Sequence, residues 1–306
     1  MACASYGCFP ARAQHTVTVP SPLRLPLATV FKGEEKFQKI IKQAEAENWR
    51  TRPIGERTVL AARSLVGTPY VNFTLEVDDK IENPVVNFNA MDCWTFYENS
   101  LGIARLLAYK PGPYKPEDLL HMIEIERYRN GTCNGSYLSR MHHLEEVFYD
   151  NHKRKFAELI TPRIPGAETM KRNIQEMTVQ WESYRYLKNN KSLIEPMGKI
   201  ENYVSQLPVY QIPKSKVLNS ERYLADGDIC AITTTSAAQY TTHVGLIIRI
   251  KGRAHLMHAT STRSKGRCCI IDQPISDYLE EKSTHSGIAV CRPKDLPKSN
   301  FWPVKK

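Results

Sequence analysis

The spacing of hydrophobic residues changes about two thirds of the way along the chain. Over residues 54–65, Val59, Leu60, Ala62 and Leu65 recur at intervals of one to three positions that place them on one face of a helix. After residue 228, short apolar runs alternate with turns, a pattern typical of β-strands. Helices followed by strands predict an α+β domain with an antiparallel sheet.

The same pattern predicts the positions of the individual elements. We expect an exposed helix over 34–48, an amphipathic helix over 54–65, a helix that starts near 92 and ends by 110, a helix or strand over 119–128, and a helix over 144–151. We expect strands at 229–232, 244–250, 254–259, 270–271 and 287–292. A tight hairpin at Lys251-Gly252-Arg253 joins the second and third strands.

Proline and charge patterns divide the chain into three parts. Residues 1–32 are rich in Pro, Ser and Thr, which predicts a leader or flexible tether, although its first residues lack the apolar core of a signal peptide. Residues 33–306 are then a single catalytic domain. A helical, basic insertion is expected within it at about 135–215, where prolines interrupt the pattern.

Composition narrows the class of protein without identifying it. The chain has 306 residues and a net charge of +10, which suits an anionic partner such as nucleic acid, an acidic lipid surface or a cell-wall polymer. It contains no nucleic-acid-binding motif and no apolar run near the roughly 20 residues of a membrane span. The eight cysteines include no Cys-x-x-Cys pair, so we expect no structural zinc site of that spacing.

One cysteine stands where a nucleophile would be made. Cys93 follows Asp92, a good N-cap residue, and precedes an apolar helical run. The unpaired N–H groups at a helix start favour a thiolate. An isolated cysteine is more often a small buried hydrophobic residue, so a role for Cys93 depends on a partner base elsewhere in the chain.

Two histidines on the predicted strands supply that base. His243 and His258 fall on strands joined by the hairpin, so they can lie side by side on one face of the sheet. His255 differs from His258 by an odd number of residues and should face the opposite side. We predict that Cys93 and His243 form a thiolate–imidazolium pair, and that His258 fixes the tautomer of His243.

In their order along the chain, these residues resemble a known motif set. Gly67-Thr68-Pro69-Tyr70, Asp92-Cys93, Gly227-Asp228-Ile229, the run 242–247 and the run 258–261 are similar to the motifs of the NlpC-type papain-like cell-wall cysteine hydrolases. The Thr95-Phe96-Tyr97-Glu98 run, the stretches 129–131, 139–142 and 209–213, and Arg292-Pro293 resemble its N-acetylmuramoyl-L-alanine-amidase-like branch. Trp94 and His143 depart from that branch.

The resemblance implies a papain-like NlpC-type fold and a cysteine amidase. Its substrate would be peptidoglycan or muropeptides, cut between N-acetylmuramic acid and L-alanine, with no cofactor, no metal and no nucleic-acid partner. Such an enzyme would be bacterial and periplasmic or secreted. Carried over, the catalytic residues are Cys93, His243 and His258. The substrate-binding candidates are Tyr70, Asp92, Arg140 and His142.

The binding roles have alternatives. Arg140 and His142 would grip the carboxylate of the stem peptide, because a guanidinium matches a carboxylate with two hydrogen bonds. Alternatively, Arg140 pairs with a neighbouring acid such as Glu145 or Glu146. Tyr70 would help to bind the substrate or the oxyanion, or it is a packed aromatic residue.

Three other functions stay open on the sequence alone. The first is an NlpC-type peptidase that cuts the bond between D-glutamate and the diamino acid. The second is a zinc amidase that uses His243, His255, His258 or Cys268. The third is a non-catalytic basic module that binds cell-wall polymer or nucleic acid. The sequence does not determine the oligomeric state.

Overall fold

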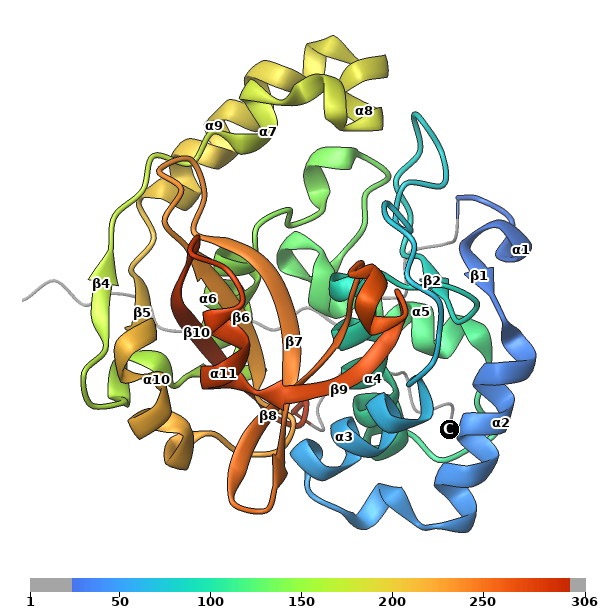
Figure 1. Cartoon of the computed structure of the whole chain (residues 1–306). Coiled ribbons are helices and arrows are strands. Elements are labelled where there is room, and N and C mark those ends of the chain that lie inside the picture. The colour runs from blue at the N-terminus through green and yellow to red at the C-terminus, as the bar shows by residue number, and fades with distance from the viewer. Residues whose placement is uncertain (1–23, 298–306) are drawn as a thin grey trace, which may run out of the picture.

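One antiparallel sheet organises the fold of the protein, whose computed structural model describes residues 24–297 (Figure 1). Among these residues, eight strands pair in the order β4-β5-β10-β6-β7-β8-β9, with β3 also pairing on β10. These strands are β3 (Ala157–Leu159), β4 (Glu168–Met170), β5 (Val209–Pro213), β6 (Ile229–Thr234), β7 (Thr241–Ile250), β8 (Arg253–Ala259), β9 (Cys269–Pro274) and β10 (His285–Pro293). Two short strands, β1 (Phe31–Lys32) and β2 (Val86–Asn87), form a separate parallel pair.

The helices precede the main sheet in sequence or connect its strands. They are α1 (Leu27–Val30), α2 (Glu34–Ala46), α3 (Ile54–Ser64), α4 (Cys93–Tyr109), α5 (Pro116–Arg127), α6 (Leu144–Lys153), α7 (Glu176–Val179), α8 (Arg185–Asn189), α9 (Ile194–Ser205), α10 (Lys214–Ser220) and α11 (Ile275–Glu280). Single-turn 3₁₀ helices occupy several connections. The predicted α+β class with an antiparallel sheet is confirmed, and none of the described helices is long and apolar enough to span a membrane.

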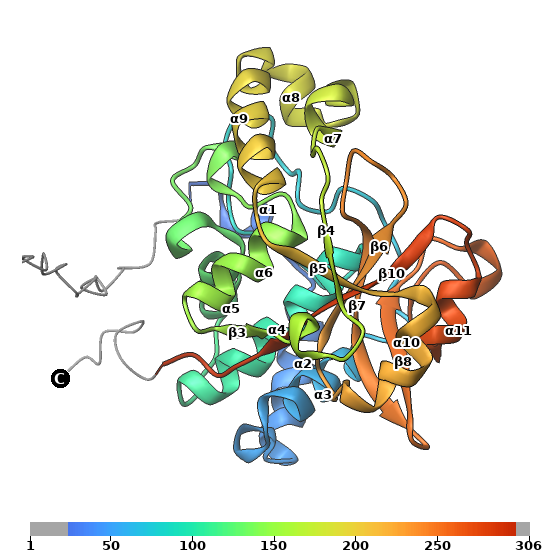
Figure 2. The same ribbon diagram turned by 90° about the vertical axis from the view of Figure 1, so that its left-hand side faces the viewer.

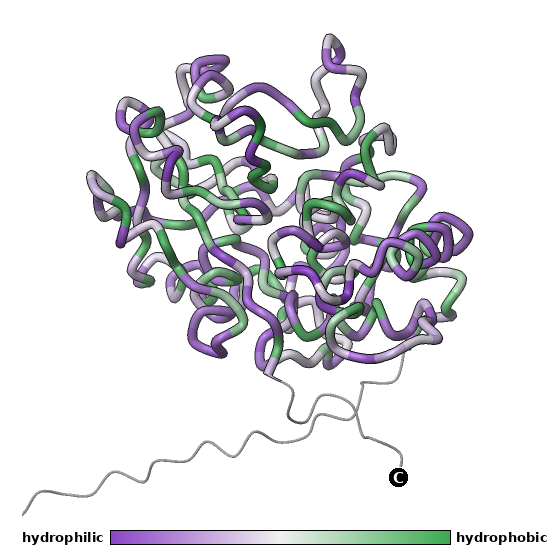
Figure 3. The backbone as a smooth tube through the Cα atoms, turned by 90° about the horizontal axis from the view of Figure 1, so that it is seen from below, coloured by the Kyte–Doolittle hydropathy of each residue, from purple (hydrophilic) through white to green (hydrophobic). Residues whose placement is uncertain are grey.

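Alternation along the strands gives the sheet two apolar faces. On β7, Val244 and Leu246 belong to the larger core, which the sheet shares with α2 to α5. Ile247, next to Leu246, belongs to the second core, which α10 and α11 cover. Figure 3 shows how green hydrophobic stretches alternate with purple hydrophilic ones along the chain. Helix α4 is buried along almost its whole length, so the residue at its start has a fixed position relative to the sheet.

Ion pairs inside the protein hold α4 against α5. Glu98 on α4 accepts hydrogen bonds from Arg127, and Arg105 on α4 pairs with Glu126 at 3.0 Å. All four side chains are buried. Removing one partner of such a pair leaves an uncompensated charge in the interior, which makes the orientation of α4 depend on both pairs.

Two of the expected assignments near the N-terminus differ from the structure. Helix α2 has an apolar face with Phe37, Ile40 and Ile41 buried, so it is amphipathic rather than merely exposed. Residues 24–32, assigned to the leader, contain α1 and β1, and Val30 and Phe31 lie in the main core. The rest of the expected leader, residues 1–23, lies outside the described residues.

The region expected as a helical insertion at about 135–215 is mixed. It contains α6 to α9, but also β3, β4 and β5, which join the main sheet. Helices α7 to α9 form a lobe at the top of Figures 1 and 2, beyond the end of the sheet. A small core of their own, which includes Met177, Leu187 and Met197, holds this lobe together.

Candidate active site

Cys93 is the first residue of α4, as the N-cap pattern predicted. Asp92 Oδ1 accepts a hydrogen bond from Thr95 N at 2.8 Å, and Thr95 Oγ1 accepts one from Asp92 N at 3.0 Å. This reciprocal capping box satisfies donors that the start of the helix would otherwise leave unpaired. The backbone of α4 therefore fixes where the Cys93 side chain begins.

The sulfur of Cys93 lies against strand β7. The backbone N–H groups of Val244, Trp94 and Cys93 itself donate toward the thiol. Val244 follows His243 directly, and Cys93 and His243 line the same cleft. The structure thus brings the predicted nucleophile and the predicted base, 150 positions apart in sequence, into one place.

The two predicted histidines are hydrogen-bonded to each other. His243 Nε2 and His258 Nδ1 lie 2.6 Å apart. The register pairs Leu246 with Met257, so His243 and His258 are diagonal neighbours rather than directly opposite. His255 instead places its Nδ1 2.9 Å from the carbonyl oxygen of Asp272, away from His243.

A chain of polar groups continues beyond His258. Its Nε2 lies 3.1 Å from Asp272 Oδ2, and Lys265 Nζ lies 2.5 Å from the same oxygen. The ring of Tyr278 on α11 stacks on His243, with 6.2 Å between ring centroids. The sequence pattern did not indicate a role for Asp272, Lys265 or Tyr278. Asp272 follows the predicted Ile270-Ile271 strand, but only the strand register shows that it reaches His258.

Burial dominates the electrostatics of Cys93 and His243. It raises the pKa of the Cys93 thiol to about 12, with a further contribution from the charge of Asp92. Burial, followed by His258 and Lys282, lowers the pKa of His243 well below its usual value. The resting pair is therefore a neutral thiol and a neutral imidazole. Burial thus opposes both charges of the predicted thiolate–imidazolium pair.

A groove runs past Cys93 in both directions. We call it the active-site groove, and its middle is lined by Cys93, Trp94, His142, His143 and Glu176. One end reaches Tyr70, Glu76, Tyr137 and Arg140, and the other reaches Glu145, Thr241 and His243. The groove gives an extended substrate a path over the thiol.

The expected binding residues Tyr70 and Asp92 both line this groove. The Tyr70 hydroxyl donates to Asn72 Oδ1 at 2.7 Å, and its ring is half-buried. Both carboxylate oxygens of Asp92 are engaged within the protein, because Thr95 N donates to Oδ1 and Thr74 Oγ1 donates to Oδ2 at 3.1 Å. Asp92 therefore serves mainly as the cap of α4. The Tyr70 hydroxyl, which has one partner among the described residues, is more available to a substrate than the Asp92 carboxylate.

Arg140 lies at one end of the groove and is buried. Its Nη2 is 3.7 Å from Glu76 and its Nε is 3.6 Å from Glu82. The acids expected as its alternative partners are wrong, since Glu146 binds Arg129 and Glu145 accepts from Thr241. Among the described residues, neither Nε nor Nη1 of Arg140 has a hydrogen-bond partner, and both atoms are buried.

His142 does not fit the role expected for it. Burial and nearby Arg140 lower its pKa well below the usual value, so the ring is neutral. Its Nε2 lies 2.9 Å from the carbonyl oxygen of Tyr137, which can only accept. The single N–H is thus used, and Nδ1 is left as an acceptor. A neutral acceptor cannot grip a carboxylate, but it can receive an N–H or O–H group of a substrate.

Trp94 and His143, the two departures from the family pattern, sit beside the nucleophile. Burial lowers the pKa of His143 to about 4, so it is also neutral. His143 Nε2 and Trp94 Nε1 are buried, and neither has a hydrogen-bond partner within the described part of the chain. Unsatisfied buried polar atoms are uncommon, and here two lie beside Cys93 in the middle of the groove.

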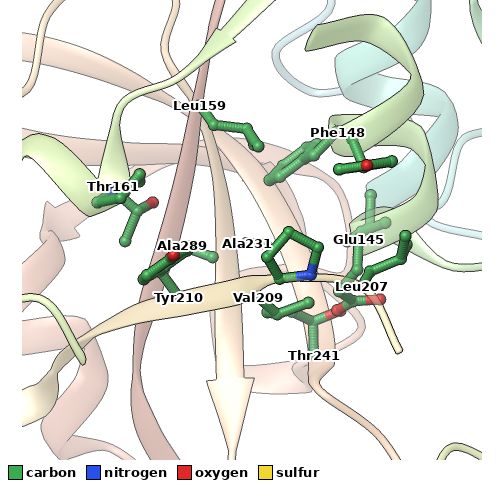
Figure 4. A pocket seen from close by; sticks show the side chains of 14 residues that line it. Glu145, Phe148, Leu159, Thr161, Leu207, Val209, Tyr210, Ala231, Thr241 and Ala289 are labelled. Atoms are coloured by element: carbon green, nitrogen blue, oxygen red, sulfur yellow. The ribbon is translucent and has the colours of Figure 1, made fainter. Parts of the chain in front are cut away.

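A smaller cavity lies behind the groove, between α6 and the sheet (Figure 4). Most of its lining is apolar, including Phe148, Leu159 and Val209. Glu145 borders both this cavity and the groove, and Thr241 Oγ1 donates to its Oε1 at 2.7 Å. Burial raises the pKa of Glu145 to about 7. The carboxyl group is therefore partly protonated at neutral pH.

Residues 60–288, well over half of the chain, match a family described as AmiA-like, N-acetylmuramoyl-L-alanine amidase-like. The chain belongs to this family. No group of three or more His, Cys, Asp or Glu side chains arranged to hold a metal ion occurs within residues 24–297 of this family member. No curated protein matches the sequence.

Solved structures share the fold of this amidase-like protein, and one of them is named as an amidase. An N-acetylmuramoyl-L-alanine amidase from Bacteroides uniformis is 27% identical, with a TM-score of 0.71, over 79% of this chain and 99% of that one. A Bacteroides fragilis protein with a provisional xylanase name is 30% identical, with a TM-score of 0.66, over 76% and 98%. A Legionella pneumophila protein shares the fold at 19% identity and a TM-score of 0.65, over 89% and 99%.

Proposed function

We propose that this protein is an NlpC-type, papain-like cysteine amidase that hydrolyses the amide between the lactyl group of N-acetylmuramic acid and L-alanine in peptidoglycan fragments. The observation that carries the proposal is the position of Cys93. Cys93 is the first residue of α4 and lines the same groove as His243. His243 Nε2 lies 2.6 Å from His258 Nδ1, and the chain belongs to the amidase-like family. The substrate lies in the cell wall, so the enzyme would act in the periplasm or outside the cell.

The neutral resting pair determines how attack begins. His258 occupies Nε2 of His243, so Nδ1 is the ring nitrogen left to act as base. As Cys93 Sγ attacks the lactyl carbonyl carbon, its proton passes to His243 Nδ1. The carbonyl oxygen becomes an oxyanion, which the Cys93 N–H at the helix start can stabilise.

The same histidine completes the cycle. His243 gives its proton to the nitrogen of the leaving L-alanine, the C–N bond breaks, and an acyl thioester remains on Cys93. A water molecule then attacks the thioester carbonyl carbon while His243 takes its proton. The C–S bond breaks, the Cys93 thiolate leaves and takes that proton from His243, and the products are a muramic acid carboxylate and a peptide with a free amino terminus.

A defined muropeptide tests both the bond and the mechanism. We expect the wild-type protein to release N-acetylmuramic acid and the intact stem peptide, as measured by mass spectrometry, and Cys93→Ala to abolish turnover. Cleavage between D-glutamate and the diamino acid would instead establish the peptidase. Binding of polymer with no turnover by the wild type would establish a non-catalytic module.

Inhibitors separate the cysteine route from a zinc route. We expect a strong chelator to leave the activity intact and a thiol alkylator to abolish it. The alkylated residue should be Cys93, identified by peptide mass mapping. Loss of activity with the chelator, restored by zinc, would contradict the cysteine mechanism.

A further inference from the structure

The hydrogen bond between His243 and His258 has two possible directions, and only one suits catalysis. If His243 Nε2–H donates to His258 Nδ1, then His243 Nδ1 carries a lone pair and can accept the proton of Cys93. If His258 Nδ1–H donates instead, a neutral His243 carries its proton on Nδ1 and cannot act as a base. The pair alone does not decide between these directions.

Asp272 supplies the missing bias. Its Oδ2 lies 3.1 Å from His258 Nε2, and a carboxylate can only accept at that position. His258 Nε2 must therefore carry a hydrogen. Burial lowers the pKa of His258, which keeps the ring neutral, so its Nδ1 has no hydrogen and must accept from His243. The side chain of His258 is 1% exposed and that of Asp272 is 10% exposed, so water does not replace this contact freely.

Lys265 keeps both members of this contact in the required charge state. Its Nζ lies 2.5 Å from Asp272 Oδ2, and it also pairs with Glu281. With His258, it holds the pKa of Asp272 well below the usual range. It also opposes protonation of His258, which Asp272 and Glu281 favour. A doubly protonated His258 would donate from Nδ1 and reverse the chain.

The other charged groups around the rings of His243 and His258 do not oppose a hydrogen bond donated by His243 to His258. Lys282 and His285 face His243 and lower its pKa, which keeps it neutral. Tyr278 on α11 packs against both rings, and burial raises its pKa well above the pH of any assay, so it carries no charge.

We propose that Asp272, held by Lys265, is a positioning residue that sets the direction of the His258–His243 hydrogen bond and thereby keeps Nδ1 of His243 free for the thiol of Cys93. The inference depends on one part of the proposed function, which is that the Cys93 thiol is the nucleophile. It extends the three-residue site to a chain of Cys93, His243, His258, Asp272 and Lys265.

Asp272→Asn tests the direction sharply. Asp272 Oδ1 accepts from Gln273 N at 2.8 Å, so the amide oxygen should stay there and the NH₂ group should replace Oδ2 when the substitution is made in a Lys265→Met background, where no ammonium faces that position. That NH₂ group donates toward His258 Nε2 and requires a lone pair on it, which reverses the chain. Asp277→Asn is the matched control, because Asp277 is a half-exposed acid on α11 that pairs with Arg253.

Two measurements show whether the direction of the hydrogen-bond chain has changed. With ¹⁵N-labelled histidine, the nitrogen resonances of wild type should show the Nε2–H tautomer for His243 and His258, assigned with His243→Ala and His258→Asn. Asp272→Asn should lose this pattern, and kcat/KM on a defined muropeptide should fall by about 100-fold. Asp277→Asn should match wild type in both.

Lys265→Met provides a second variant whose effect is a change in pH dependence. It should raise the pKa of His258 and move the acidic limb of the kcat/KM profile to higher pH. If wild type shows the Nδ1–H tautomer for His243, or if Asp272→Asn keeps its tautomers and rate, the proposal is overturned. If wild type cleaves no muropeptide yet Asp272→Asn changes the tautomers, the hydrogen-bond chain stands and only the proposed substrate fails.

Discussion

The thiol of Cys93 is under two opposing influences, the start of a helix and burial. Backbone N–H groups lower its pKa, whereas desolvation and Asp92 raise it, and the result is about 12. The alkylation rate of Cys93 by iodoacetamide should therefore rise by about tenfold per pH unit from pH 7 to 9.5. Mass spectrometry of the Cys93 peptide measures this rate, with Cys93→Ala as the blank. A plateau across that range would show the ion pair instead.

Asp92 combines a structural and an electrostatic effect, and two substitutions separate them. Asp92→Asn keeps an acceptor for Thr95 N but removes the charge that raises the pKa of Cys93, so alkylation at pH 8 should become several times faster. Asp92→Ala also removes the cap of α4 and should lower the free energy of unfolding by about 1 kcal/mol. Denaturant unfolding measures the second effect, which should be small in Asp92→Asn. Equal destabilisation of both variants would contradict this division.

Residue types and spacing could predict Cys93, His243 and His258, because a helix start and paired strands have regular geometry. The partners that decide charge states could not be predicted in this way. Asp272 reaches His258 through a register that includes an irregularity between His255 and Met257. The neutral state of His142 depends on burial and on the charge of Arg140, and both arise only in the folded chain.

At the scale of elements, the close approach of β7 and β8 explains a glycine in the motif. A Cβ atom on Gly245 would lie 2.5 Å from the carbonyl oxygen of Met257 and 3.0 Å from His258 Cβ. Gly245→Ala should therefore push β8 away and displace His258. We expect kcat/KM to fall by at least about tenfold, measured on the muropeptide.

The hairpin between the same two strands offers a control for Gly245→Ala. Gly252 has a φ of +82°, and a Cβ atom added to it would meet no other atom within 4 Å. Gly252→Ala should reduce stability by about 1 kcal/mol through backbone strain, yet leave the activity near that of wild type. Equal activities for the two variants would contradict the role given to Gly245.

The sequence pattern located most of these elements, since α3 and β6 to β10 lie close to their expected positions. Strands β3, β4 and β5 were missed. Strands β3 and β4 have only three residues each, too few for an alternation to show, and β5 lies in the region expected to be helical. Each pairs with a neighbour distant in sequence, and that pairing rather than local propensity makes it a strand.

At the scale of the whole molecule, the ionisation of Glu145, which lines the groove, makes the stability of the fold depend on pH. Its folded-state pKa of about 7 lies above the usual 4.5, so the folded protein opposes ionisation more than the unfolded protein does. The contribution of Glu145 to the free energy of unfolding is fully present below pH 4.5. It falls by about 3 kcal/mol in total as the pH rises to about 7.

The side chain in Glu145→Gln cannot ionise, so this variant should not lose stability in that way. Its amide oxygen can still accept the hydrogen bond from Thr241. We expect its free energy of unfolding to fall less than that of wild type between pH 5 and pH 8, as measured by urea titration. Glu195→Gln, on the exposed surface of α9, should follow the wild type. Parallel curves for wild type and Glu145→Gln would contradict the prediction.

Strand β10 has a consequence for the order of assembly. It follows every other described strand in sequence, yet it lies inside the sheet, with β6 on one edge and β5 and β3 on the other. Until residues 285–293 arrive, β6 to β9, β4 with β5, and β3 alone are three separate pieces with open edges. During synthesis, the main sheet can thus be completed only after residues up to 293 have been made, and its closure joins segments more than a hundred positions apart.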